Sequence, residues 1–224
     1  MTGPLALIGG GEWSAGCSFD AELLAAVGAD EVVLLPTAYA FENPRRHVER
    51  ATAWFAELGV KVAALDVLQR ADAHDDTYVA AVRGAKLVYL AGDSPMHLRS
   101  VLKSSPLYEA MLDAFRGGAV IAASGAAATV LCDPMVDPRG GAYTVGLGFV
   151  GNLAVFPYHG TAADHMRERS IDLLPAAAKL VGIDEETALV LSSDGAWRAA
   201  GAGTVTVYTG RDTTTFASGQ PVTL

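Results

Sequence analysis

Residues 117–128 read Gly117-Gly118-Ala119-Val120-Ile121-Ala122-Ala123-Ser124-Gly125-Ala126-Ala127-Ala128. The apolar run at its start predicts a buried strand, and the small residues that follow predict a sharp turn into a helix. A strand, a tight turn and a helix are the setting of a nucleophile elbow, in which the nucleophile sits on the turn. The stretch lacks the G-x-S-x-G pattern of that motif, so an ordinary strand-to-helix turn is the alternative interpretation.

The alternation of strands and helices extends to both sides of this stretch. Near-continuous apolar runs predict further strands at 5–8, 31–36, 60–65 and 86–91, and helical spacing predicts helices at 19–27, 45–58, 77–83 and 106–115. Strands that alternate with helices are typical of a parallel sheet with helices on both faces. We therefore predict an α/β fold.

The second half of the chain has a different pattern. Short strands are predicted at 142–145 and 153–156, a helix at 162–179, and a meander of strands between 188 and 208. The residues after Gly210 are rich in Thr, Ser and Gly, which is typical of a frayed end. We expect one α/β domain over residues 1–210 with a β-rich C-terminal edge, followed by a tail over residues 211–224.

Composition excludes several classes of protein. The chain has 224 residues, of which 51% are hydrophobic and 18% charged, so it is not disordered. Its net charge of −9 argues against nucleic-acid binding, which needs a basic surface. No apolar run approaches the ~20 residues of a membrane span, and the start lacks the basic segment of a signal peptide. Two cysteines, Cys17 and Cys132, suit a reducing compartment, so we expect a cytoplasmic protein without a membrane partner.

Glycine-rich turns follow the first and fourth predicted strands. They are Gly9-Gly10-Gly11 and Gly92-Asp93-Ser94-Pro95. Ligands of open α/β sheets bind where the carboxyl ends of the strands meet, so Gly10, Gly11 and Gly92 are candidate ligand-binding residues. The alternatives are a tight turn at the first position and, at the second, a helix that begins at Pro95 with Asp93 or Ser94 as its cap.

His159 is the best-placed candidate base. It lies in Phe156-Pro157-Tyr158-His159-Gly160, directly after a predicted strand. Asp133 and Asp137 are candidate residues to orient it, although Asp-Pro pairs are also ordinary turn formers. Because no histidine pair has zinc-ligand spacing near a cysteine, we expect no metal site. We also expect no cofactor.

In this order and spacing, the motifs resemble peptidase family S51, the group of dipeptidase E and cyanophycinase. The resemblance runs from Gly9 to about Tyr208 and rests on the segments quoted above together with Pro36-Thr37-Ala38, Gly146-Leu147-Gly148 and Gly182-Ile183-Asp184-Glu185-Glu186-Thr187-Ala188. It implies a flavodoxin-like fold of the class I glutamine amidotransferase type. It also implies a site for a small peptide-like or amino-acid-like ligand, and we add a homodimer as an expected assembly.

The chain departs from the family pattern at the elbow. The family reads G-[ST]-S-A-G-A there, and an ungapped count from Gly117 puts Gly125 at the nucleophile's position and Ser124 before it. Both elbow glycines are alanines, and Asp93 occupies an oxyanion-loop position that is usually glycine. A carboxylate beside an oxyanion opposes the developing negative charge. Glycine suits the positive φ of an elbow, whereas a register with Ser124 as nucleophile needs a one-residue slip of the strand.

Three functions follow from these positions. The first is a pseudoenzyme or repurposed enzyme that binds its ligand at Gly125 and Ala126 and has Asp93 and His159 as an acid/base pair. The second is an active serine peptidase or acyl hydrolase that uses Ser124 as nucleophile and His159 as base. The third, a glutaminase, is disfavoured because Cys132 lies about two helical turns beyond the elbow.

Overall fold

The central sheet is mostly parallel. The computed structural model describes residues 2–137, 139–210 and 212–224, and its largest sheet has the strand order β16-β13-β12-β1-β5-β4-β2-β3. The parallel strands are β1 (Leu5–Ile8), β2 (Glu31–Leu35), β3 (Lys61–Ala64), β4 (Leu87–Ala91) and β5 (Val120–Ser124). The antiparallel strands are β12 (Thr187–Leu191), β13 (Trp197–Gly201) and β16 (Pro221–Val222). The prediction of a flavodoxin-like α/β fold is confirmed.

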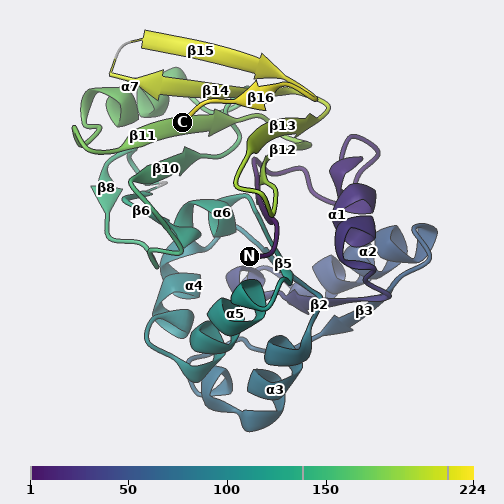
Figure 1. The fold of residues 1–224 in the computed structure, drawn as a ribbon. Helices are drawn as coiled ribbons and strands as arrows, with labels where there is room; N and C mark the ends of the chain where they lie inside the picture. Colours follow the sequence, from purple (N-terminus) through teal and green to yellow (C-terminus); the bar gives the residue numbers. More distant parts are fainter. Residues whose placement is uncertain (1, 138, 211) are drawn as a thin grey trace.

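Helices cover both faces of this sheet (Figure 1). Side chains alternate across β1, so that Leu5 and Leu7 enter one apolar core and Ala6 and Ile8 enter the other. The helices α1 (Phe19–Val27) and α2 (Pro44–Glu57) pack on the Ala6 side. The Leu5 side is covered by α3 (Asp76–Gly84), α4 (Pro95–Leu102), α5 (Pro106–Arg116) and α6 (Ala126–Leu131). Two short 3-10 turns, η1 (Thr37–Tyr39) and η2 (Asp72–His74), lie in the connections.

A second sheet carries the C-terminal half. Its order is β15-β14-β11-β10-β6-β9, and β7 and β8 form a separate pair. The strands are β6 (Cys132–Asp133), β7 (Met135–Val136), β8 (Tyr143–Thr144), β9 (Val150–Gly151), β10 (Leu153–Phe156), β11 (Lys179–Ile183), β14 (Thr204–Thr209) and β15 (Asp212–Ala217). Helix α7 (Asp164–Asp172) covers one face, where Phe156 and Tyr208 form a third apolar cluster with Met166 packed against it.

Three expectations for the second half were wrong. The helix predicted at 162–179 ends at Asp172, because the chain before Pro175 leaves the helical conformation, and Lys179–Ile183 form the buried strand β11. The meander does not stay in one sheet, since β13 pairs with β12 whereas β14 pairs with β11. The expected tail contains β15 and β16, paired with β14 and β13; Arg211 lies outside the described residues. Its threonines and Phe216 favour a strand.

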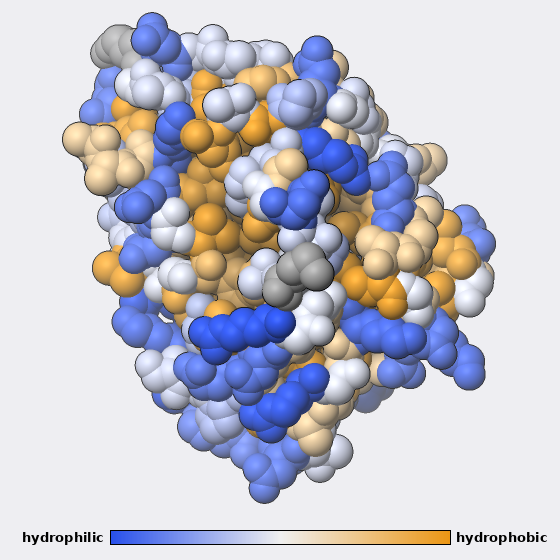
Figure 2. All heavy atoms as spheres, viewed as in Figure 1, coloured by the Kyte–Doolittle hydropathy of each residue, from blue (hydrophilic) through white to orange (hydrophobic). Residues whose placement is uncertain are grey.

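The surface between the two halves is partly apolar. In the space-filling view, hydrophobic residues gather over the region near the C-terminal strands, between patches of hydrophilic residues (Figure 2). Partly buried residues on the main core include Leu147, Phe149, Trp197 and Leu224. Among the described residues, no helix has the length and apolar character needed to cross a bilayer.

Candidate functional site

The carboxyl ends of β1, β4 and β5 meet at one edge of the central sheet. Ile8 and Ala91 are both register partners of Ser124, the last residue of β5. The turns that carry Gly10, Gly92 and Gly125 therefore lie together, as the sequence predicts. The backbone N–H of Gly125 donates to the Ile8 carbonyl at 3.0 Å, which ties the elbow to the end of β1.

Gly125 occupies the bend between β5 and α6. Its φ is 62° and its ψ is −130°, a conformation that side chains rarely adopt. A Cβ at this position would overlap the Tyr158 hydroxyl oxygen and lie 3.3 Å from an Asp93 carboxylate oxygen. Ala126, the first residue of α6, follows directly and is also buried. The backbone therefore has an elbow geometry, with glycine at its apex.

Ser124, the last residue of β5, is fully buried. Its hydroxyl donates to Oε2 of Glu12 at 2.7 Å, and the Tyr39 hydroxyl donates to the other oxygen of the same carboxylate. Burial and the Glu12 charge raise the pKa of Tyr39 above its ordinary value, so this phenol stays protonated. Glu12 was not among the predicted site residues, although it directly follows Gly9-Gly10-Gly11 and so lies at the predicted edge.

Tyr158 fills the space in front of Gly125. It holds a left-handed φ of 53°, and its ring packs where a side chain on Gly10 would stand. Its N–H donates to the Gly9 carbonyl at 2.7 Å, and its hydroxyl donates to Oδ1 of Asp93. Burial, followed by the Asp93 charge, raises the pKa of Tyr158, which keeps the hydroxyl a donor. Tyr158 was not among the predicted site residues, although it directly precedes His159.

The glycine turns are close to protein atoms. Side chains on Gly10 and Gly92 would overlap the Tyr158 ring and the Ala38 backbone, respectively. Gly11, with a φ of 66°, lies against Glu186. The missing side chains of Gly10 and Gly92 thus leave space for the Tyr158 ring and the Ala38 backbone. No contact in the described part of the chain assigns Gly10, Gly11 or Gly92 to a ligand.

Neither expected side-chain cap forms at the start of α4. The helix begins at Pro95 as predicted, with Ser94 as N-cap, but no side-chain cap bond is made there. The Ser94 hydroxyl instead donates to Glu42 at 3.4 Å, and Asp93 accepts from Tyr158. Asp93 is thereby turned toward the elbow rather than toward the helix.

His159 lies shortly after the end of β10, with neighbours other than those expected. Its Nδ1 is 3.2 Å from Oδ1 of Asp184, and its Nε2 is 2.6 Å from the Tyr208 hydroxyl. The ring lies over Gly182, where a Cβ would overlap it. Both ring nitrogens are thus engaged in the second sheet, and the expected pairing of His159 with Asp93 is not formed.

Asp184, not Asp133 or Asp137, lies beside His159. Asp137 pairs with Arg139 at 2.6 Å, and Asp133 accepts from the Gly146 N–H at 3.3 Å. Burial raises the pKa of Asp184, but hydrogen bonds from Thr204 and His159 outweigh it, so that the pKa lies below its ordinary value. Asp184 lies in the Gly182–Ala188 stretch that carries the family resemblance, which was the available signal.

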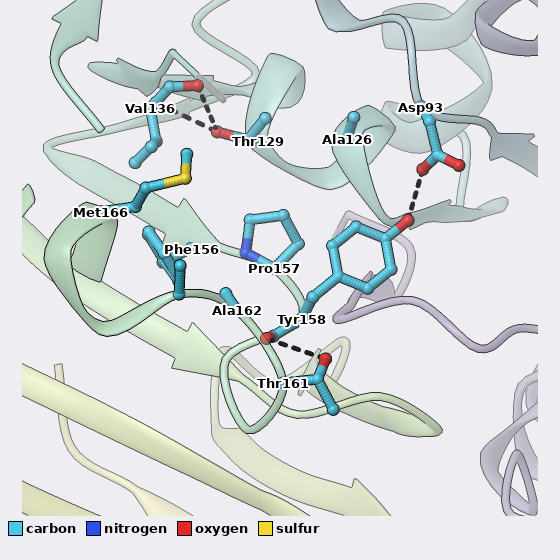
Figure 3. Close-up of a pocket in the computed structure, with 11 residues that line it drawn as sticks. Asp93, Ala126, Thr129, Val136, Phe156, Pro157, Tyr158, Thr161, Ala162 and Met166 are labelled. Carbon is cyan, nitrogen blue, oxygen red and sulfur yellow. Dashed lines mark hydrogen bonds between the residues drawn. The ribbon is translucent and has the colours of Figure 1, made fainter. Parts of the chain in front are cut away.

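A pocket opens beside the elbow (Figure 3). Its volume is about 440 Å³, within the range of roughly 300–1,000 Å³ typical of small-molecule sites. Asp93 and the Tyr158 hydroxyl lie at one end, and Val136, Phe156 and Met166 lie toward the other. Ala126 links the pocket to the elbow. The site can therefore hold a small molecule with one polar and one apolar end.

Other nucleophiles and metal ligands contribute little. Cys132 is fully buried, and burial raises the pKa of its thiol, which disfavours a thiolate. Across residues 2–137, 139–210 and 212–224, no cluster of three or more histidine, cysteine, aspartate or glutamate side chains is placed to hold a metal ion.

Comparison with known proteins extends the resemblance. The profile of peptidase family S51 matches residues 5–198. A cyanophycinase from Synechococcus elongatus is 29% identical over 174 residues, which cover 70% of this chain and 52% of that protein. A cyanophycinase from a Nostoc species is also 29% identical, over 68% of this chain and 55% of its own length. The chain thus spans about half the length of these curated relatives.

Solved structures share the fold of this chain. The crystal structure of a peptidase from an acI-B1 Actinobacterium has a TM-score of 0.90 and 28% identity, and the match covers 100% of this chain and 98% of that one. A putative peptidase E from Listeria monocytogenes, with a TM-score of 0.65 and 14% identity over both full chains, shares the fold. With the family profile matched over most of its length, the chain belongs to peptidase family S51.

Proposed function

We propose that this S51 protein does not use a serine nucleophile and that its site binds a peptide- or amino-acid-derived small molecule. The observation that carries the proposal is the elbow, where Gly125 stands at the bend and Tyr158 takes up the space of a side chain. The neighbouring Ser124 is fully buried, and its hydroxyl donates a hydrogen bond to Glu12. A hydroxyl in that position has neither access to substrate nor an adjacent histidine as base.

Asp93 and Tyr158 are the polar groups available to a ligand in the pocket. Asp93 is exposed, and the phenol that donates to it stays protonated because its pKa is raised. A carboxylate held in this way accepts hydrogen bonds from a ligand, and it can also take up a proton in a reaction without a covalent intermediate. It opposes an oxyanion, which is the species that an acyl-transfer site must stabilise.

A serine-directed fluorophosphonate probe tests the first half of the proposal. We expect no labelling of the wild-type protein and no change in Ser124→Ala, with an active serine hydrolase as positive control. Stoichiometric labelling that Ser124→Ala abolishes would establish the active-hydrolase alternative.

Calorimetric titration tests the second half, with amino acids, their amides, the corresponding amines and dipeptides as ligands. We expect at least one of these to bind to the wild-type protein. Ala163→Trp is the blocking variant, because Ala163 lines the pocket and is exposed, so that a large side chain can fill the opening without disturbing the core. Binding that this variant does not weaken would place the ligand elsewhere.

A further inference from the structure

We infer that the pocket beside the elbow is selective for a small organic cation, an ammonium group on an apolar body without a carboxylate. The inference rests on the proposed function and names the chemical class of its ligand. The observation behind it is the distribution of charge around the pocket. Asp93 is the one charged side chain among the lining residues that the structure describes, and no lysine, arginine or histidine is among them.

The polar end of the pocket has an unused acceptor. Oδ1 of Asp93 accepts from Tyr158, while Oδ2 has no hydrogen bond within the described part of the chain. Because Tyr158 donates to Asp93, the phenol does not compete for the second oxygen. An ammonium group supplies up to three donors, and hydrogen bonds to a charged carboxylate are stronger than neutral ones.

Further carboxylates make this end unfavourable for anions. Tyr158 is subject to the negative charges of Asp93, Glu12 and Glu185. Glu185 accepts a hydrogen bond at 2.9 Å from Thr161, which itself lines the pocket. Like charges repel, and none of the lining residues is cationic, so a ligand carboxylate would face this acidic group without a cation beside it in the lining. An α-amino acid or a dipeptide with a free carboxyl group is therefore disfavoured relative to the matching amine.

The remaining wall favours an apolar body. Val136, Phe156, Pro157, Ala162 and Met166 supply carbon and sulfur surface, and Figure 3 shows several of them on the side away from Asp93. Phe156 is buried in the third apolar cluster, so this wall is fixed by the core of the second sheet. Burial of an apolar ligand group against it is favourable by roughly 25 cal/mol per Å².

Four compounds with one common body separate these contributions. Calorimetric titration uses 2-phenylethylamine, its neutral analogue 2-phenylethanol, the amino acid phenylalanine and the anion 3-phenylpropionate. A fifth compound, isoamylamine, keeps the ammonium group but has an aliphatic body in place of the aromatic one. We expect both amines to bind, and 2-phenylethylamine to bind at least roughly tenfold more tightly than each of its three matched analogues, since one charge-assisted hydrogen bond has about this effect.

Two variants locate the binding. Asp93→Asn keeps the acceptor for Tyr158 but removes the charge, so it should weaken amine binding by roughly 10- to 100-fold and leave the alcohol unchanged. Glu42→Gln is the matched control: this carboxylate lies on the Ser94 side of the same loop and does not line the pocket. It should leave both affinities unchanged.

Three results would overturn the inference. They are an amine that binds no better than the alcohol, an amine affinity that Asp93→Asn leaves intact, and equal or tighter binding of phenylalanine. The last result would leave the proposed function standing, because the pocket would still bind an amino acid. Fluorophosphonate labelling at Ser124 would instead reject the proposed function, whatever the titrations show.

Discussion

Gly125 and Tyr158 are predicted to be energetically coupled, and a double-mutant cycle measures the coupling. Gly125→Ala introduces two penalties. An alanine at a φ of 62° and a ψ of −130° costs roughly 1–3 kcal/mol in backbone strain. The overlap of its Cβ with the Tyr158 hydroxyl costs roughly another 1–3 kcal/mol as overpacking.

Tyr158→Phe removes the second penalty and leaves the first. Without the hydroxyl, the nearest atoms to the new Cβ are the Tyr158 ring carbon Cζ at 3.2 Å and an Asp93 oxygen at 3.3 Å, close contacts that small shifts relieve. Alone, Tyr158→Phe loses one hydrogen bond to an exposed carboxylate, at a cost of about 1 kcal/mol. The double mutant should therefore be more stable than the sum of the single effects, by roughly 1–3 kcal/mol.

Urea unfolding of the four proteins, followed by circular dichroism, gives the coupling energy. Gly28→Ala is the matched control, because Gly28 also has a positive φ, 58°, but nothing lies within 4 Å of its added Cβ. It should not couple to Tyr158→Phe. A coupling energy for Gly125 below about 0.5 kcal/mol would refute the assignment of Tyr158 to the space at the elbow.

Three further predictions concern buried or partly buried groups. Burial raises the pKa of Asp20 from 3.8 to about 7, so the free energy of unfolding should fall by roughly 4 kcal/mol as the pH rises between these values. Asp20→Asn should abolish this dependence of the unfolding free energy on pH, measured by urea titrations at several pH values. An unchanged pH dependence would contradict its assignment to Asp20. Ser124→Ala leaves Glu12 with one hydroxyl donor and should lower the unfolding free energy by roughly 1–3 kcal/mol, measured at neutral pH. Asp184→Asn weakens contacts to His159 and should destabilise by roughly 1–2 kcal/mol; because the pKa of Asp184 is lowered, the difference from wild type should shrink as the pH falls through that pKa.

The parallel half of the fold was predictable because its sequence signals are local. Strands β1 to β4 are short apolar runs, and each lies within one residue of its predicted bounds. Helix α1 matches the expected 19–27. The switch between sheets after Gly201 has no comparable signal, because a strand's sequence does not specify which of two sheets it joins. The backbone of Gly201, with a φ of 108°, allows this change of direction.

The site was predictable in position but not in its contacts. Glycines at strand ends located the edge, because the carboxyl ends of parallel strands converge there. The role of Tyr158 depends on a left-handed φ, which is rare for tyrosine and is held here by the surrounding structure. The partner of His159 was not predicted either: Asp184 directly follows strand β11 in the Gly182–Ala188 stretch, but the sequence does not specify which acidic residue that strand brings beside the histidine.

These contacts explain why a serine at position 125 would not by itself restore a hydrolase. Its side chain would compete with the Tyr158 hydroxyl for the same space and would face the Asp93 carboxylate. The ring of His159 would also have to leave Asp184 and Tyr208 before it could act as a base. Displacement of Tyr158, removal of the Asp93 charge and reorientation of His159 are separate requirements. Because the first breaks the hydrogen bond between Tyr158 and Asp93, a single substitution loses stability before any nucleophile can be activated.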